Sequence, residues 1–337
     1  MSSPLSIPVT PAGIDRRRFI QGLAAASVLA PGLSHAAYPD RPVRLIIPFI
    51  AGGPTDQLAR LFGDRLSKVL GQPVIADNRP GANSTVAVQA TLQNGADGYT
   101  VFFAGQGVLA VTPQLTKKLP YDVDKDLTPV GVVANMPLTM VVNSSLPVKT
   151  VADFVAYAKA RPGQLNFGSP GIGNPLHLAV ELFNAAAGIR MQHIPFNGTA
   201  PALTALRSGE IHTVFDVVTT AVPHVKAGTL RALAVTSLQR SSALPEIPTM
   251  SESGYPGFEA SSWYALTTAS AAPSDVKDRL AKATQAVISD PEFGPTLDKL
   301  GLIPYPPMDM AAVQNFVQKE RARWGTVIRE NKITLDT

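Results

Sequence analysis

The stretch VRLIIPFIAGGPTDQLARLFGDRLSKVLG, residues 43–71, decides the fold. Residues 43–49 are rich in the branched and aromatic side chains that favour a β-strand. Two glycines and a proline follow, and apolar residues then recur at the spacing of one helix face. We predict a strand, a glycine-rich loop and a helix that has Thr55 as its N-cap and ends at a left-handed Gly71. This unit is typical of α/β proteins.

The same alternation continues along the chain and predicts two α/β lobes. Further strands are expected at residues 74–76, 100–104, 138–143, 165–167, 192–195, 211–215 and 230–236, and helices at 151–160, 175–188, 200–208, 218–227, 274–289, 291–300 and 310–330. No Pro/Ser-rich linker separates the two runs, and the last helices have too few strands beside them for a third domain. We therefore predict lobe one at 38–138, lobe two at 139–258, and a return to lobe one at 259–337.

Residues 1–37 read as an export signal. Arg16, Arg17 and Arg18 precede an apolar run at residues 19–29, and small residues around Ala36 and Ala37 offer a cleavage site. The run is too short to be a permanent anchor. The arginines resemble the twin-arginine export motif, and a Sec signal is the alternative. Either route predicts a periplasmic protein.

Composition excludes several classes of function. The 337 residues carry a net charge of only +4, part of it in the leader, and 16% are charged, so nothing favours nucleic-acid or membrane-surface binding. The chain has no cysteine. Disulfides, thiolate metal sites, a Cys nucleophile and a lipoprotein anchor are therefore excluded. No later segment is long and apolar enough to span a membrane.

Three glycine-rich loops, at residues 51–55, 168–173 and 197–199, each follow a predicted strand and precede a predicted helix. In open α/β sheets, ligands bind at the carboxyl ends of the strands. Helix N-termini present free N–H groups and a partial positive charge, and glycine lets an anion approach them. For any one loop, an ordinary tight turn is the favoured reading. Three together favour an uncharged clamp for a carboxylate.

A few polar residues near these loops are further candidates. Asp56 lies in the first turn after Gly52 and Gly53, where it caps the helix, orients the loop or binds an amine of the ligand. Asp216 follows a predicted strand and faces the same predicted cleft. His177 begins the helix after the second loop, where capping or packing is favoured over ligand contact.

Enzyme motifs are missing. Residues 171–176 lack the third glycine of a dinucleotide fingerprint, and no phosphate-binding loop occurs. Ser169 lacks the preceding glycine of a nucleophile elbow. The histidines have no metal-ligand spacing. The sequence thus predicts no catalytic residue, metal or cofactor.

Several segments occur in an order that resembles a known family: YPDRPVR (38–44), PFIAGGPTD (48–56), DNRPGA (77–82), DGYT (97–100), GSPGIG (168–173) and PFNG (195–198). This order is similar to that of the substrate-binding proteins of tripartite tricarboxylate transporters, the Bug receptors. The resemblance covers essentially the whole chain after residue 37. It implies a two-lobe, type II-like Venus-flytrap fold, with a carboxylate held between the lobes by backbone amides and waters.

The resemblance and the loops together give one set of candidate ligand-binding residues. Two departures from the family pattern stand beside it: Asn83 and Ser84 replace a more usual glycine-containing stretch, and Pro175 removes one backbone donor. The candidates are Phe49, Ala51, Gly52, Gly53, Pro54, Thr55, Asp56, Asn83, Ser84, Gly105, Gln106, Ser169, Gly171, Ile172, Gly173, His177, Phe196, Asn197, Gly198, Thr199, Ala200 and Asp216.

The function expected is a monomeric periplasmic receptor that captures a small carboxylate for the membrane subunits of a tripartite tricarboxylate-type transporter. A ligand-sensing receptor for a membrane histidine kinase is the alternative, and a periplasmic hydrolase or lyase is less favoured. The sequence does not identify the carboxylate.

Overall fold

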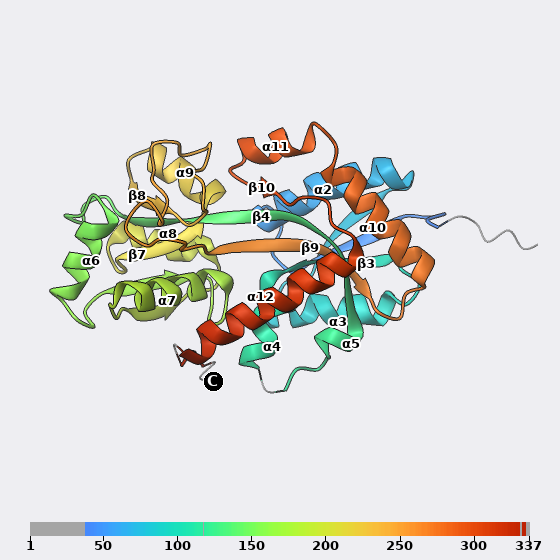
Figure 1. Cartoon of the computed structure of the whole chain (residues 1–337), viewed down its shortest axis with the longest axis horizontal. Helices are drawn as coiled ribbons and strands as arrows, with labels where there is room; N and C mark the ends of the chain where they lie inside the picture. Colours follow the sequence, from blue (N-terminus) through green and yellow to red (C-terminus); the bar gives the residue numbers. More distant parts are fainter. Residues whose placement is uncertain (1–37, 117, 331, 335–337) are drawn as a thin grey trace, which may run out of the picture. The chain divides into compact units, whose positions relative to one another are not determined.

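The computed structural model describes residues 38–116, 118–330 and 332–334; the predicted export signal lies outside them. These residues form one mixed sheet with the order β2-β1-β3-β9-β4-β7-β5-β6, while β8 and β10 also pair with β4 (Figure 1). The α/β prediction is confirmed. The strands are β1 (Val43–Ile47), β2 (Val74–Asn78), β3 (Thr100–Gly105), β4 (Leu127–Asn143), β5 (Asn166–Ser169), β6 (Gln192–Pro195), β7 (Thr213–Val217), β8 (Leu230–Val235), β9 (Ser261–Ala269) and β10 (Ile303–Pro304).

Strand β4 belongs to both halves of this sheet. Its residues 127–137 pair with β9, and residues 138–143 pair with β7 and β8. Only residues 138–143 were predicted as a strand, because Pro129 and Pro137 indicate breaks in the sequence. The register shifts between Pro129 and Gly131, and such irregularities are where a strand tolerates proline. Strand β9 was not predicted at all.

Helices pack on this sheet through their apolar faces. They are α2 (Pro54–Leu70), α3 (Thr85–Asn94), α4 (Thr112–Leu115), α5 (Val123–Asp126), α6 (Val151–Lys159), α7 (Pro175–Ala187), α8 (Thr199–Ser208), α9 (Val218–Lys226), α10 (Ser274–Ile288), α11 (Phe293–Lys299) and α12 (Met310–Glu330). Short turns η2 (Ala82–Ser84) and η3 (Gly107–Val111), the latter a π-helical turn, precede α3 and α4. Among the described helices, none has the length and apolarity to cross a membrane.

Of the two predicted caps of helix α2, the structure confirms only the C-terminal one. Gly71 ends it with φ of 74°, so the predicted left-handed cap is confirmed. The predicted N-cap Thr55 is wrong, because the helix already begins at Pro54 and Gly53 is the N-cap. Proline at the first helical position has its φ preset and needs no N–H there. Arg65, on the same helix, is largely buried and donates to Asp290.

The C-terminal helix α12 is fixed by one carboxylate. Glu320 Oε2 accepts hydrogen bonds from the indole nitrogens of Trp263 (2.9 Å) and Trp324 (3.2 Å) and from the Gln106 amide (3.1 Å). Both tryptophans are almost fully buried. Glu320 therefore ties α12 both to β9 and to the segment that leaves β3.

Gly131 tests the packing of β4. A methyl group there would lie 2.5 Å from Cγ2 of the fully buried Thr284 on α10. We predict that Gly131→Ala lowers the free energy of unfolding by about 1–3 kcal/mol through overpacking. Urea unfolding measures this change. Gly294→Ala is the matched control, since its methyl group would sit 3.7 Å from Pro304, and it should leave stability unchanged or slightly higher. Equal losses in both variants would contradict the packing argument.

Candidate ligand-binding site

The carboxyl ends of strands from both halves of the sheet face one junction. Strand β3 runs parallel to β4, whereas β5 and β7 run in the opposite direction. Strand β3 ends at Gly105, which pairs with Tyr264 and so lies level with Ala134 of β4. Strand β7 ends at Val217, opposite Leu138. Four residues of β4 separate these levels, or about 13 Å. The loops after β1, β3, β5 and β7 are therefore directed towards the same region.

The first glycine loop is organised by Asp56. Its carboxylate accepts the Gly52 N–H at 2.8 Å and the Asn78 amide at 2.8 Å, and it pairs with Arg60. Asn78 also donates to the Phe49 carbonyl at 3.0 Å. Burial opposes the charge on Asp56, but the hydrogen bonds from Arg60, Gly52 and Asn78 outweigh it and lower the pKa of this carboxyl. Asp56 thus fixes the shape of the loop, which is the orienting role expected from the sequence.

The N-terminus of α2, which follows this loop, has no side-chain cap. Gly53 carries no capping group, and Pro54 has no N–H. The backbone N–H groups of Thr55 and Asp56 donate no hydrogen bond within the described chain. The Thr55 hydroxyl donates instead to Tyr264 Oη at 2.8 Å, which ties the helix start to β9. Ala51 and Gly52 are exposed beside these free amides.

The second glycine loop satisfies most of its own donors. The Gly173 N–H donates to His177 Nδ1 at 3.1 Å, and the Leu176 N–H donates to the Asn174 side chain at 3.0 Å. The Gly171 N–H reaches Ser169 Oγ at 3.3 Å. Only the Ile172 N–H makes no hydrogen bond in the described structure of this loop. Helix α7 is therefore capped internally, and the predicted role of His177 as a capping and packing residue is confirmed.

Three stacked aromatic rings support this loop. The His177 and His193 rings stack at 3.9 Å between centroids, and Phe167 stacks on both. His193 Nε2 shares a hydrogen bond of 2.7 Å with Ser169 Oγ. Burial, followed by the neighbouring His177, lowers the pKa of His193 to about 4. His193 is therefore uncharged near neutral pH, and it was missed because its partners are distant in sequence.

The third loop leads into a second uncapped helix. Gly198, the N-cap of α8, has φ of 111° and offers no side-chain cap. The backbone N–H groups of Thr199 and Ala200 donate no hydrogen bond within the described residues. Phe196 N–H donates to the Ser169 carbonyl at 2.9 Å, which places this loop beside the second one. Asn197 lies between Phe196 and the N-cap.

Asp216 is a fully buried acid at the end of β7. One carboxyl oxygen, Oδ2, is hydrogen-bonded to the Thr220 hydroxyl, while Oδ1 has no partner in the described structure. Thr219 Oγ1 is also buried without a partner there. Burial raises the pKa of Asp216 to about 7. Sequence reasoning placed Asp216 in the site but could not see that half of its carboxyl group is unsatisfied.

The remaining candidates lie at the edge of this arrangement. The Gln106 amide nitrogen is held by Glu320, and its buried Oε1 has no partner among the described residues. Gly105 packs under the ring of Tyr264, where a methyl group would lie 2.8 Å from Cε1. Asn83 is exposed and Ser84 half-buried, both with positive φ, in a turn that contacts η3.

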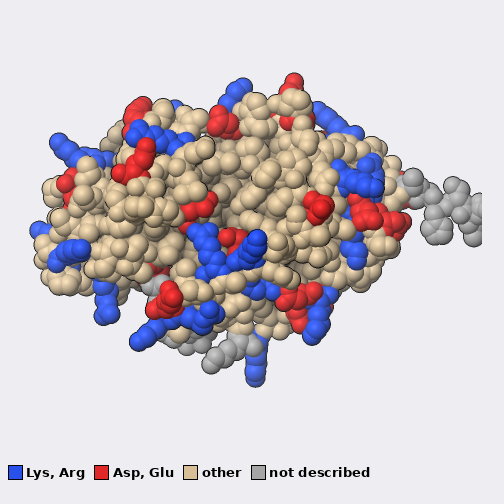
Figure 2. Space-filling model, in the orientation of Figure 1, with Lys and Arg blue, Asp and Glu red and all other residues tan. Residues whose placement is uncertain are grey.

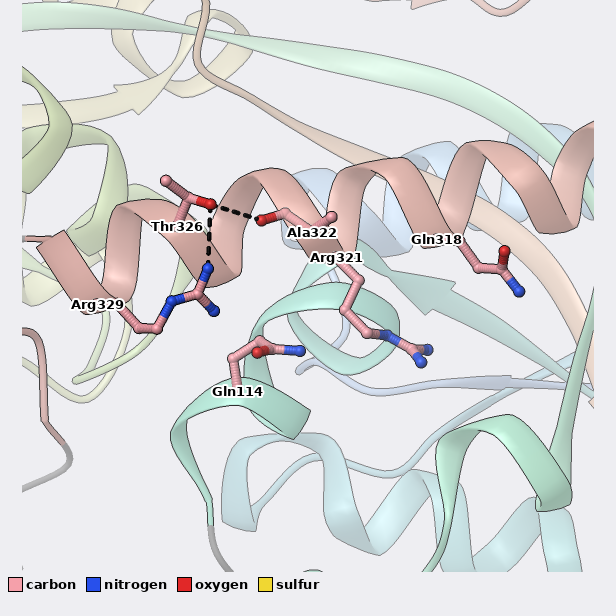
Figure 3. Close-up of a pocket in the computed structure, with 6 residues that line it drawn as sticks. All are labelled: Gln114, Gln318, Arg321, Ala322, Thr326 and Arg329. Carbon is pink, nitrogen blue, oxygen red and sulfur yellow. Dashed lines mark hydrogen bonds between the residues drawn. The ribbon is translucent and has the colours of Figure 1, made fainter.

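A surface hollow lies elsewhere on the molecule. It measures about 370 Å³ between α4 and α12 and is lined by Gln114, Gln318, Arg321, Ala322, Thr326 and Arg329 (Figure 3). Arg321 is already engaged there by Asp124 and by the Leu109 carbonyl. None of the candidate ligand-binding residues lines this hollow. Basic and acidic side chains are interspersed on the face shown in Figure 2, over a mostly uncharged surface.

No group of residues in the described ranges has the make-up of a metal site. The donors brought to the junction are backbone N–H groups, and the acceptors are Asp216 and the threonine hydroxyls. Free backbone N–H groups of this kind suit a small polar anion.

The raised pKa of Asp216 predicts a pH-dependent stability. Since the unfolded state releases this proton first, the folded state loses stability between about pH 4 and pH 7, by up to about 4 kcal/mol. Asp216→Asn removes that loss, so its melting temperature should rise relative to wild type as pH increases from 4.5 to 8. Asp278→Asn, on the exposed face of α10, should parallel wild type. A difference between Asp216→Asn and wild type that does not change with pH would contradict the assignment.

Comparison with known sequences identifies the family. A sequence profile described as "Tripartite tricarboxylate transporter family receptor" matches residues 58–333. BugT of Bordetella pertussis is 39% identical over 245 residues, which cover 72% of this chain and 75% of BugT. A relative from Bordetella bronchiseptica, named only as a member of an uncharacterised protein family, is 36% identical over 290 residues, covering 84% of this chain and 86% of that protein.

Solved structures agree. Rpa4515 of R. palustris, solved with adipate, matches with a TM-score of 0.82 and 35% identity over 88% of this chain and 99% of its own. MatC of Rhodopseudomonas palustris, with bound malate, matches with a TM-score of 0.77 and 30% identity over 86% and 100%. The periplasmic binding protein BugD matches with a TM-score of 0.78 and 31% identity over 88% and 99%. The chain has the predicted two-lobe periplasmic binding protein fold and belongs to the Bug-type receptors of the tripartite tricarboxylate transporter family.

Proposed function

We propose that this protein is a periplasmic receptor that captures a small carboxylate and delivers it to the membrane subunits of a tripartite tricarboxylate-type transporter, without catalysing a reaction. One observation carries the proposal. The N-termini of α2 and α8 both lack a side-chain cap, and they follow strands that run towards the junction from opposite sides. The ligand carboxylate would accept the hydrogen bonds that no side chain accepts.

Electrostatics support a neutral clamp. Free N–H groups and the helix dipole favour a negative group at each of these helix starts. Arg60, a cation on the first turns of α2, is paired with Asp56. The carboxylate would therefore be bound without a Lys or Arg partner, and salt should weaken binding only mildly. The adipate in Rpa4515 and the malate in MatC support a carboxylate as the ligand class.

We assign lobe one to residues 38–138, lobe two to 139–258 and the return to 259–337. The change of partners along β4 supports the first boundary, because Pro137 still pairs with β9 whereas Leu138 pairs with β7. Closure of two such lobes on a ligand gives the transporter a state to recognise, a population shift driven by differential affinity.

A thermal-shift screen tests the ligand class. The refolded, ligand-free protein is heated with small carboxylates and with their neutral amides. A carboxylate at a hundredfold excess over its Kd should stabilise the protein by about 2.7 kcal/mol, and its amide should not. Stabilisation by amides as strong as that by the acids would contradict the anion clamp, and turnover of a stabilising acid would contradict a non-enzymatic role.

Gly53 offers a sharper test, because its φ of −74° suits any residue and a methyl group there makes only an ordinary contact of 3.6 Å. An aspartate at this N-cap would accept the free amides of α2 itself. We predict that Gly53→Asp raises the free energy of unfolding by roughly a few tenths of a kcal/mol while weakening carboxylate binding at least about a hundredfold, or 2.7 kcal/mol. Calorimetric titration and thermal unfolding measure both effects.

Gly53→Ala is the matched control, since alanine fills the same space without an acceptor. It should bind within a few fold of wild type. If Gly53→Asp binds as tightly as Gly53→Ala, the N-terminus of α2 is not part of the clamp.

A further inference from the structure

We propose that the ligand carries a second polar group with a hydrogen-bond donor, a hydroxyl or an ammonium, which binds between Asp216 Oδ1 and Thr219 Oγ1. The ligand class would then be hydroxy- or amino-substituted carboxylates. This inference rests on the proposed receptor function. Its starting point is that both oxygens are buried and have no partner in the described structure.

The Asp216 carboxyl has an open hydrogen-bonding position at Oδ1 in either protonation state. Thr220 Oγ1 lies within hydrogen-bond distance of both Asp216 Oδ2 and the Val217 carbonyl, but a hydroxyl has only one proton. If Thr220 donates to Asp216 Oδ2, Oδ1 is a free acceptor when the acid is ionised and a free O–H donor when it carries the proton. If Thr220 donates to Val217, a proton on Oδ2 satisfies the contact and Oδ1 is a free carbonyl-type acceptor.

Three threonine hydroxyls near Asp216 do not bond to Oδ1. Thr139, which pairs with Asp216 across the sheet, donates its hydroxyl to the Ala234 carbonyl at 3.0 Å. Thr213 on the same strand donates to the Val141 carbonyl at 3.0 Å. Thr236, directly after β8, is likewise bonded to backbone carbonyls. These three hydroxyls are committed to backbone carbonyls, so none of them donates to Asp216 Oδ1.

The position of Asp216 suits a ligand. It lies one residue before the end of β7, level with Thr139, close to where β4 changes partners between the two halves of the sheet. The second and third loops follow the parallel strands β5 and β6 of the same half. A carboxylate on the helix N-termini could therefore place a substituent against the end of β7.

Chemistry favours a donor over a second carboxylate. A carboxylate brings only acceptors and fits Oδ1 only where that oxygen carries the proton, whereas a hydroxyl or an ammonium supplies a proton to the ionised acid or to a carbonyl-type Oδ1. Thr219 Oγ1 can donate to a hydroxyl oxygen or accept from an ammonium. The pair thus fits a group that donates once to Asp216 and makes a second hydrogen bond to Thr219.

Matched ligands test the inference directly. Calorimetric titration of the refolded protein would compare succinate with malate and aspartate, adipate with 2-aminoadipate, and benzoate with 4-hydroxybenzoate. Within the set that binds, the donor-bearing member should bind at least tenfold more tightly than its parent acid. Asp216→Leu should reduce that preference to within about twofold, and Thr219→Val should reduce it in part. Asp278→Asn should keep it.

The outcomes separate the two proposals. If the parent acids bind as tightly as their substituted partners, the proposed site between Asp216 Oδ1 and Thr219 Oγ1 is wrong, while the carboxylate-receptor proposal stands. A preference that survives in folded Thr219→Val and Asp216→Leu also overturns it. If no acid in the set binds, the result contradicts the carboxylate-receptor proposal itself, and with it the proposed site between Asp216 Oδ1 and Thr219 Oγ1.

Discussion

Strand β4 is the constraint on which the rest of the structure depends. Its 17 residues pair with β9 in one half of the sheet and with β7 and β8 in the other. Strand β9 is antiparallel to β4, so its other neighbour β3 is parallel to β4, whereas β7 is antiparallel to β4. Strands β3 and β7 therefore run in opposite directions, and their carboxyl ends face the same junction. The site is thus a consequence of strand direction: the loops after β3 and β7 are directed towards one region because β4 joins the two halves of the sheet, although they are more than a hundred residues apart.

Side chains then decide which backbone donors remain for a ligand. Asp56 takes the Gly52 N–H, His177 takes the Gly173 N–H, and Asn174 takes the Leu176 N–H. These bonds shape the first two glycine loops. The first turns of α2 and α8 receive no such acceptor from the described residues. Similar glycine-rich loops therefore precede two kinds of helix start. Side chains of the chain cap the start of α7, whereas the starts of α2 and α8 have no side-chain cap.

Much of the fold could be predicted from the sequence. The helix expected at 310–330 matches α12 residue for residue, and the strand at 192–195 matches β6. The misses have physical reasons. Prolines inside β4 concealed its length, since a register shift accommodates Pro129 and Pro137 lies where the strand changes partners, not at a strand end. Strand β9, with buried serines and threonines, lacks the apolar alternation of a half-exposed strand.

The candidate site was predictable only in outline. Sequence could place glycine loops after strands and Asp216 at a strand end, because these are local patterns. It could not show that Gln106 is held by Glu320, 214 positions away, or that His193 supports Ser169. Nor could it show which amides are already bonded. That information lies in contacts between residues far apart in the chain.

Unsatisfied hydrogen bonds mark this site only together with strand direction, because Asn135 and Asn184 also have buried oxygens without a partner in the described structure, and α9 and α10 also start without a side-chain cap. A buried acid lacking a partner and an uncapped helix start each lower the stability of the folded chain, and replacing either is usually easy in sequence. Here the uncapped starts of α2 and α8 and the unpartnered Asp216 Oδ1 lie at the ends of strands that are directed towards one junction. Because closing the lobes on a ligand would supply the missing partners, the stability given up in the free protein becomes affinity for the ligand in the closed one. Such a receptor would bind ligands that supply the missing hydrogen-bond partners, so the groups without partners in the free protein would decide which ligands bind.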